Sequence, residues 1–243
     1  AWYDRRDSPS YDRPYTHTPN ADIYGVRIGI PEEYFGSGVN PEVAAVVNKA
    51  VGRLEELGAT TVPCSIPSME YALAAYYVIC TCEASSNLAR FDGVRYGPAA
   101  DSKKSWHEAY KEVRRENFGT EVRRRIMLGT FALSSGYYGK YYAKAQVARE
   151  NVKKDFARIF ADVDVIAGPT MPTVAFRLGE KSDPLSMYLT DILTVPVNLA
   201  GIPAISVPCG KAEGMPVGLQ IMGRPWEDER VIDVAFAYEQ GCI

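Results

Sequence analysis

The sequence predicts a layered α/β/α domain built around a mixed β-sheet, and two observations support this fold class. The first is a strand, a helix and a second strand in quick succession early in the chain, an order typical of parallel strands joined by a crossover helix. The second is a pair of strand-like segments late in the chain, close enough to form an antiparallel hairpin. With 47% hydrophobic and 23% charged residues, the 243-residue chain has enough apolar side chains for one sizeable core or two small domains.

The early strand–helix–strand unit can be assigned residue by residue. Residues 24–31 alternate between apolar and polar side chains, as a strand does. Asn40 is a good N-cap for the helix that follows, with a proline and an acidic residue in its first turn. Gly58 predicts where this helix ends, and residues 60–66 form the next strand. The apolar positions of the helix recur at spacings of three and four: Val43, Val47, Ala50, Leu54 and Leu57.

The rest of the chain continues to alternate between helical and strand-like segments. Residues 1–22, with three scattered prolines and no periodicity, are expected to be an extended lead-in or linker to a domain over 23–243. The further elements expected are a mostly apolar helix over 69–89, a loop over 92–107, helical stretches over 108–135 and 138–161, a buried strand over 163–167, a short helix over 185–193, a hairpin of 204–208 with 216–222, and an amphipathic helix over 226–240.

Charge and cysteine content argue against several classes of protein. The net charge is −3, and the one basic run, Arg123 to Arg125, is too short to hold nucleic acid. Five cysteines at irregular spacings predict free thiols and no zinc site. The polar opening residues do not resemble a signal peptide, and the apolar runs are too short to cross a bilayer, so a cytoplasmic protein without a membrane partner is expected.

The residues alone do not make a complete catalytic site. His17 and His107 are the two histidines, and both lie in polar, loop-like surroundings that do not suggest a triad. Asp191 stands out because apolar residues flank it, and a buried carboxylate needs a partner. Arg125 ends a run of three arginines, and on a helix at most one or two of the three can face inward. Tyr76 and its neighbour Tyr77 lie in the apolar helix over 69–89. From the residues alone, a surface or packing role is the simpler interpretation of each of these side chains.

Several segments resemble the amidase-signature family, and together they cover residues 24 to 240. Within that family, two of them look like the branch that supplies the glutamine-hydrolysing subunit of tRNA-dependent amidotransferases: EASSNLARFDGVRYG (83–97) and RRRIMLGTFALSSGYY (123–138). The other matching segments are YGVRIGIPEEYF (24–35), VIAGPTMPTVAF (165–176), PVNLAGIPAISVPCG (196–210) and PVGLQIMGRPWEDERVIDVAFAYEQ (216–240).

The resemblance implies a glutamine pocket but no catalytic residue in this chain. By position in the matching motifs, Tyr76, Arg125 and Asp191 correspond to residues that bind glutamine. Free glutamine is a zwitterion, so Arg125 suits its α-carboxylate and Asp191 its α-ammonium. The family's catalytic lysine and two serines lie in a Gly/Ser-rich region with no counterpart here. The chain is therefore expected to be the C-terminal part of the amidase domain and inactive alone.

The resemblance also assigns the remaining chemistry of this ATP-dependent step of protein biosynthesis to other subunits. Glutamine is the expected ligand, and the B and C subunits of the amidotransferase are the expected partners. ATP, magnesium and tRNA are expected on a partner subunit, so no cofactor is expected here. Two alternatives stay open: a stand-alone amidase acting on small or aryl amides, and a non-catalytic domain that docks partners.

Overall fold

The computed structural model describes residues 16–181 and 183–242, and the chain forms two compact units. The first unit combines the described residues up to Cys64 with Phe160–Thr170 and the chain from Ile202 onward. The second unit comprises Ser65–Ile159 and Met171–Gly201. The lead-in boundary predicted at residue 22 stays a prediction, because residues 1–15 lie outside the described part, and residues 16–22 form neither helix nor strand.

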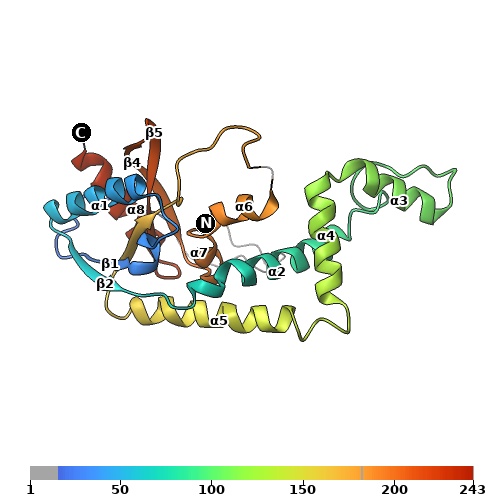
Figure 1. The fold of residues 1–243 in the computed structure, drawn as a ribbon, viewed down its shortest axis with the longest axis horizontal. Helices are drawn as coiled ribbons and strands as arrows, with labels where there is room; N and C mark the ends of the chain where they lie inside the picture. The colour runs from blue at the N-terminus through green and yellow to red at the C-terminus, as the bar shows by residue number, and fades with distance from the viewer. Residues whose placement is uncertain (1–15, 182, 243) are drawn as a thin grey trace. The chain divides into compact units, whose positions relative to one another are not determined.

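A five-stranded mixed sheet forms the first unit, with the strand order β2-β1-β3-β5-β4 (Figure 1). Strand β1 pairs in parallel with both β2 and β3, and β5 pairs antiparallel with both β3 and β4. The predicted α/β class with a mixed sheet is thereby confirmed. The strands are β1 (Arg27–Pro31), β2 (Thr60–Cys64), β3 (Val165–Pro169), β4 (Ala204–Ala212) and β5 (Met215–Gly223).

The crossover between β1 and β2 is helix α1 (Pro41–Glu56), which begins as predicted. The side chain of Asn40 accepts a hydrogen bond from the backbone N–H of Glu42 at 2.8 Å, and so satisfies a backbone donor of the first turn. Gly58 follows the helix with φ +99°, a conformation that only glycine adopts readily. Helix α1 and the last helix, α8 (Asp228–Gly241), both pack against β4 and β5. A short 3-10 helix, η1 (Glu32–Phe35), follows β1.

The predicted hairpin forms, but its strands are longer than expected. The sequence predicts a glycine-rich connection at residues 209–212 and Met215, whereas the structure places them in β4 and β5. Pairing is interrupted between Pro208 and Gly210 and then resumes, as it does at a β-bulge. The turn itself is Glu213–Gly214, with φ +50° and +77°, values that suit the twist of a two-residue hairpin.

The second unit is helical: α2 packs against both α4 and α5, and α7 packs against α2 and α5 (Figure 1). Helix α2 is the apolar helix predicted over 69–89. No helix in the described ranges is long and apolar enough to cross a membrane. The helices are α2 (Met69–Leu88), α3 (Trp106–Asn117), α4 (Thr120–Leu133), α5 (Tyr142–Ile159), α6 (Pro184–Tyr188), η2 (Leu189–Asp191) and α7 (Val195–Ala200).

The prediction of one helical stretch over 108–135 is wrong in one respect, because the structure has two helices there, α3 and α4. Phe118 has extended backbone angles, φ −103° and ψ 121°, which end α3. Gly119 then serves as the N-cap of α4. A glycine is acceptable at an N-cap, whereas inside a helix it costs about 1 kcal/mol relative to alanine. The helical conformation is therefore interrupted at Phe118 and Gly119, where it is least favourable.

Asp164 gives the first unit a defined response to acid. Burial raises the pKa of this carboxyl, but hydrogen bonds from the Arg27 backbone and side chain, with Arg224 nearby, more than offset this and lower the pKa below its ordinary 3.8. A lowered pKa stabilises the fold above the unfolded value, and this contribution is lost as pH falls through the folded pKa. We therefore expect Asp164→Asn to flatten the acid-induced loss of stability, measured by urea unfolding at a series of pH values. Identical pH slopes for the two proteins would contradict the assignment.

Two cysteines of the first unit should differ in reactivity. Burial, with a smaller influence from Cys242, raises the pKa of the Cys209 thiol to about 11, whereas Cys242 is exposed. Since the thiolate is the nucleophile, iodoacetamide at about pH 8 is expected to alkylate Cys242 well before Cys209. Peptide mass spectrometry over a time course measures both sites at once. Equal labelling rates would show that Cys209 is less shielded than its surroundings indicate.

Candidate functional site

A cavity of about 370 Å³ in the second unit brings together charged and aromatic side chains from three parts of the chain. Helix α2 contributes one tyrosine, the first turns of α4 contribute an acid and two arginines, and the segment around α6 and η2 contributes the rest. The lining residues are Tyr77, Glu121, Arg124, Arg125, Lys181, Asp183, Pro184, Met187, Tyr188, Thr190 and Asp191.

Local sequence explains how the segment from Asp183 onward folds to form one wall of the cavity. The side chain of Asp183 accepts a hydrogen bond from the Ser186 backbone N–H at 2.8 Å and so caps α6. Pro184 occupies the first turn, where its missing N–H costs nothing. The chain then passes directly into the 3-10 turn η2, whose last residue is Asp191.

Asp191 is held by a tyrosine from α2. The Tyr77 hydroxyl donates a hydrogen bond to Asp191 Oδ2 at 2.7 Å. Burial, followed by this bond to a carboxylate, raises the pKa of Tyr77 well above its ordinary value, so the hydroxyl stays protonated and remains a donor. Asp191 Oδ1 has no hydrogen-bond partner among residues 16–181 and 183–242. One carboxylate oxygen is therefore anchored, while the other has no partner in the described part of the chain.

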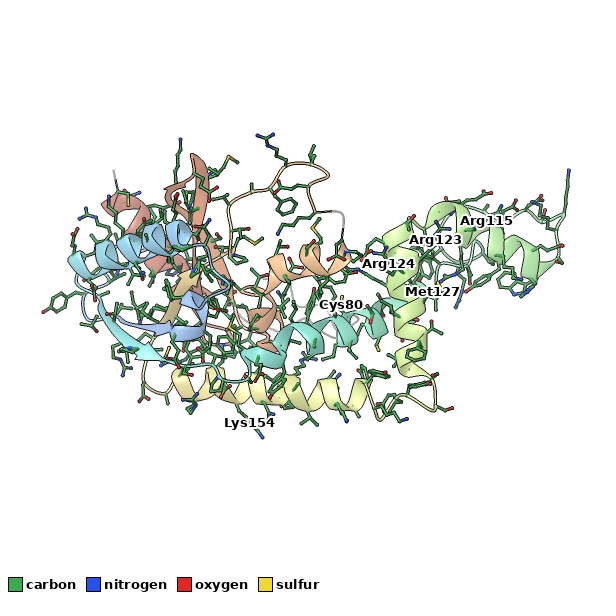
Figure 2. The ribbon with its side chains drawn as sticks, viewed as in Figure 1. Cys80, Arg115, Arg123, Arg124, Met127 and Lys154 are labelled. Atoms are coloured by element: carbon green, nitrogen blue, oxygen red, sulfur yellow. The ribbon has the colours of Figure 1, made fainter. Side chains whose placement is uncertain are left out.

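Arg125 contributes a positive charge to the cavity. Its Nε donates to Glu121 Oε1 at 3.0 Å, one helical turn earlier, and its Nη1 makes a long contact of 3.8 Å with Cys80 Sγ. The guanidinium carbon lies 5.7 Å from the ring centroid of Tyr77 and 5.9 Å from that of Tyr188, which is within cation–π range. Figure 2 shows Cys80 on α2 and Arg124 on α4, the two helices that carry this part of the site.

Two stacked tyrosines connect the walls of the cavity. The rings of Tyr77 and Tyr188 lie 4.1 Å apart with an interplanar angle of 28°. Whereas Tyr77 bonds Asp191, the Tyr188 hydroxyl donates to Glu121 Oε1 at 2.8 Å. This bond from Tyr188 is the largest influence on Glu121 and, together with Arg125 and Arg124, holds the pKa of that carboxyl below its ordinary value. Each tyrosine thus fixes one carboxylate.

The cavity can bind a ligand that carries both charges, since a guanidinium edge and a carboxylate oxygen both belong to its lining. No group of His, Cys, Asp or Glu within the described ranges could hold a metal ion. Comparison with known proteins then identifies the fold. The family profile described as Amidase matches residues 1–232.

The chain belongs to the amidase family.

Relatives of this amidase-family chain carry a more specific name. This chain is 69% identical to the A subunit of glutamyl-tRNA(Gln) amidotransferase from Methanospirillum hungatei JF-1, over 99% of the chain and 56% of that relative. It is 56% identical to the same protein from Geobacillus thermodenitrificans, over 96% of the chain and 48% of the relative. The crystal structure of the Thermotoga maritima counterpart superposes with a TM-score of 0.75 at 36% identity, covering 98% of this chain and 47% of that one.

These comparisons confirm the amidase-signature resemblance and its fold. They also show that the chain spans about half the length of the curated relatives it matches.

The structure brings two of the three predicted binding residues of this amidase-family chain into one cavity. Arg125 and Asp191 both line it, although 66 positions of sequence separate them. Tyr77 lines it as well, whereas Tyr76 is absent from the lining and packs edge-on against the Tyr77 ring at 5.3 Å. A binding role for Tyr76 stays a prediction. Of the three arginines, Arg124 and Arg125 face the cavity, and Arg123 is exposed.

Sequence reasoning left Tyr77 as an alternative and missed Glu121 and Tyr188. Glu121 precedes Arg125 by four residues, the spacing at which an acid and a base pair on one helix face, so this pair was readable from the sequence. Tyr188 had no such signal, because its partner Glu121 lies 67 residues away.

Proposed function

We propose that this chain carries the glutamine-binding half of the A subunit of a glutamyl-tRNA(Gln) amidotransferase. The observation that supports this most directly is the convergence of Arg125 and Asp191 in one cavity that is large enough for a free amino acid. The names of the relatives support it independently. Belonging to the amidase family gives the reaction class, which is attack on an amide.

In this proposal the two ends of glutamine bind to opposite charges. The α-carboxylate takes the Nη1/Nη2 edge of Arg125, because a planar guanidinium bonds both carboxylate oxygens at once. The α-ammonium takes Asp191 Oδ1, while Tyr77 keeps Oδ2 occupied. Each of these charge-assisted bonds contributes about 1.5–3 kcal/mol. The side-chain amide is left to extend from the pocket toward the reacting groups.

The reacting groups themselves belong to the signature region that the family resemblance implies. A serine there attacks the side-chain amide of glutamine, an acyl-enzyme forms and ammonia leaves. In the proposed complex, ammonia passes to a partner subunit that activates glutamate on the misacylated tRNA with ATP and magnesium, and the B and C subunits are the partners. Because no counterpart of the signature region occurs in these 243 residues, the chain alone is expected to release no ammonia from glutamine.

A stand-alone amide hydrolase is the main competing function, and the charge pair separates the two. A site for neutral aryl or aliphatic amides gains nothing from an exposed guanidinium edge and a half-bonded carboxylate, because desolvating unpaired charges costs free energy. A non-catalytic docking domain likewise needs no amino-acid-sized cavity with both charges.

Ammonia release by the natural full-length protein tests the proposal. We expect turnover of L-glutamine and much weaker turnover of two blocked analogues, L-glutamine α-amide and N-acetyl-L-glutamine, which lack the negative and the positive end respectively. An aryl amide serves as the comparison substrate. Equal turnover of glutamine and both blocked analogues, or preference for the aryl amide, would favour the stand-alone hydrolase and overturn the proposal.

A further inference from the structure

Glu121 is the most heavily bonded acid of the cavity, and the proposed glutamine contacts do not use it. Its Oε1 accepts hydrogen bonds from Arg125 Nε at 3.0 Å and from the Tyr188 hydroxyl at 2.8 Å. Its Oε2 accepts from Arg124 Nη1 at 2.7 Å. Three donors from α4 and α6 therefore converge on one carboxylate whose side chain is 44% exposed. An exposed i,i+4 pair contributes little to stability, so a stabilising role alone accounts poorly for this arrangement.

The position of the bond on Arg125 matters for binding. A guanidinium can bind a carboxylate through the edge that includes Nε or through the edge formed by Nη1 and Nη2. Glu121 occupies Nε. The other edge has only the long contact to Cys80 Sγ within the described part of the chain. A carboxylate ligand can therefore bind both Nη atoms without displacing Glu121.

Within the described ranges, the two binding charges are not paired with each other. Arg125 and Asp191 share a cavity, and an arginine side chain can adopt many rotamers. Yet Arg125 pairs with Glu121, and no ion pair joins it to Asp191 in the ranges that the structure describes. Arg124 and Arg125 both pair with Glu121, so these three side chains together keep one net positive charge.

We propose that Glu121 is a positioning residue that keeps the Nη edge of Arg125 available to a ligand carboxylate and holds Arg125 apart from Asp191. The inference rests on the proposed function, because the ligand carboxylate is that of glutamine. The Tyr188 hydroxyl donates to the same oxygen of Glu121 that Arg125 Nε contacts, and so restricts the orientation of Glu121.

Steady-state kinetics on the natural full-length protein tests this role, with L-glutamine as the probe. We expect Glu121→Ala to raise KM for glutamine about tenfold while kcat changes less than about twofold, because a bond that orients a charged group is lost. Glu121→Gln retains a carbonyl oxygen for Arg125 Nε and is expected to recover most of the loss. Glu150→Ala is the matched control, because it removes another ion pair between neighbouring turns of a helix, with Lys153, and neither residue belongs to the cavity lining.

A second readout reports on Arg125 directly. In protein labelled with ¹⁵N-arginine, the Nε–H proton of Arg125 is expected to exchange faster with solvent in Glu121→Ala than in the wild type or Glu150→Ala. Unchanged exchange would overturn the positioning role whatever the kinetics.

Arg125→Ala, measured in the same assay, distinguishes the two possible failures. If Arg125→Ala raises KM and Glu121→Ala behaves like Glu150→Ala, the positioning role is wrong and the glutamine assignment stands. If neither variant raises KM, the glutamine assignment is wrong and the positioning role is overturned with it.

Discussion

Replacing Arg125 with alanine is expected to raise KM for glutamine by roughly 10- to 150-fold, the equivalent of about 1.5–3 kcal/mol of binding free energy. The truncation removes the only proposed partner of the α-carboxylate and leaves Glu121 with one donor fewer. The effect should depend on the ligand: turnover of L-glutamine α-amide, which has no α-carboxylate, is expected to change far less. Steady-state ammonia release with both substrates measures the difference.

Arg123→Ala is the matched control for this variant. The two residues lie two positions apart on α4, but Arg123 is exposed, and its side chain makes a marginal hydrogen bond of 3.5 Å to Thr120. We expect a KM within about twofold of the wild type. Similar effects of the two substitutions, or an equal loss with the α-amide, would show that net charge and not a specific carboxylate contact determines binding.

Replacing Gly129 with alanine is expected to destabilise the second unit by about 3 kcal/mol or more. Gly129 lies in α4 where this helix packs against α2, and a Cβ atom there would lie 2.0 Å from the backbone oxygen of Thr81 and 2.8 Å from the side chain of Ser85. The backbone of a packed helix cannot move aside cheaply, so the two helices would have to separate. Urea unfolding followed by circular dichroism measures the loss.

A second glycine inside a helix provides the control. Gly52 in α1 has nothing within 4 Å of an added Cβ. Gly52→Ala is expected to stabilise α1 by about 0.5–1 kcal/mol, because alanine restricts the unfolded chain and favours helix. If Gly129→Ala also stabilised the protein, the close approach of α2 and α4 would be wrong.

The elements that sequence predicted well are those with local signals at both ends. Helix α1 has Asn40 and Pro41 at its start and Gly58 after its end, and its apolar stripe gives its phase, so its bounds and its buried face were predictable. The hairpin was recognised from its two apolar segments. Its length was underestimated because the bulge after Pro208 looks like a loop in sequence.

Sequence left two features of the second unit undecided or unseen, each for a different reason. Helix α2 is apolar on nearly every side and packs against α4, α5 and α7, so it has no polar face from which to decide whether Tyr76 or Tyr77 points to the cavity. Helix α7 was missed although Pro196 and Gly201, with φ +71°, are start and stop signals, because six residues are too few for a visible period.

The candidate site divides in the same way. The residues alone favoured a surface or structural role for Arg125 and Asp191, and only the family resemblance gave them a binding role. The structure adds the shared cavity, the tyrosine pair and Glu121. Only the Glu121–Arg125 spacing was visible beforehand, because hydrogen bonds such as Tyr188 to Glu121 join residues that the fold brings together.

A crystal structure of the natural full-length protein soaked with L-glutamine tests the central claim most directly. We expect the α-carboxylate within hydrogen-bond distance of both Nη atoms of Arg125, the α-ammonium within hydrogen-bond distance of Asp191, and Glu121 still bonded to Arg125 Nε. Glutamine bound elsewhere, or bound in this cavity with its ends reversed or out of reach of either residue, would contradict the account.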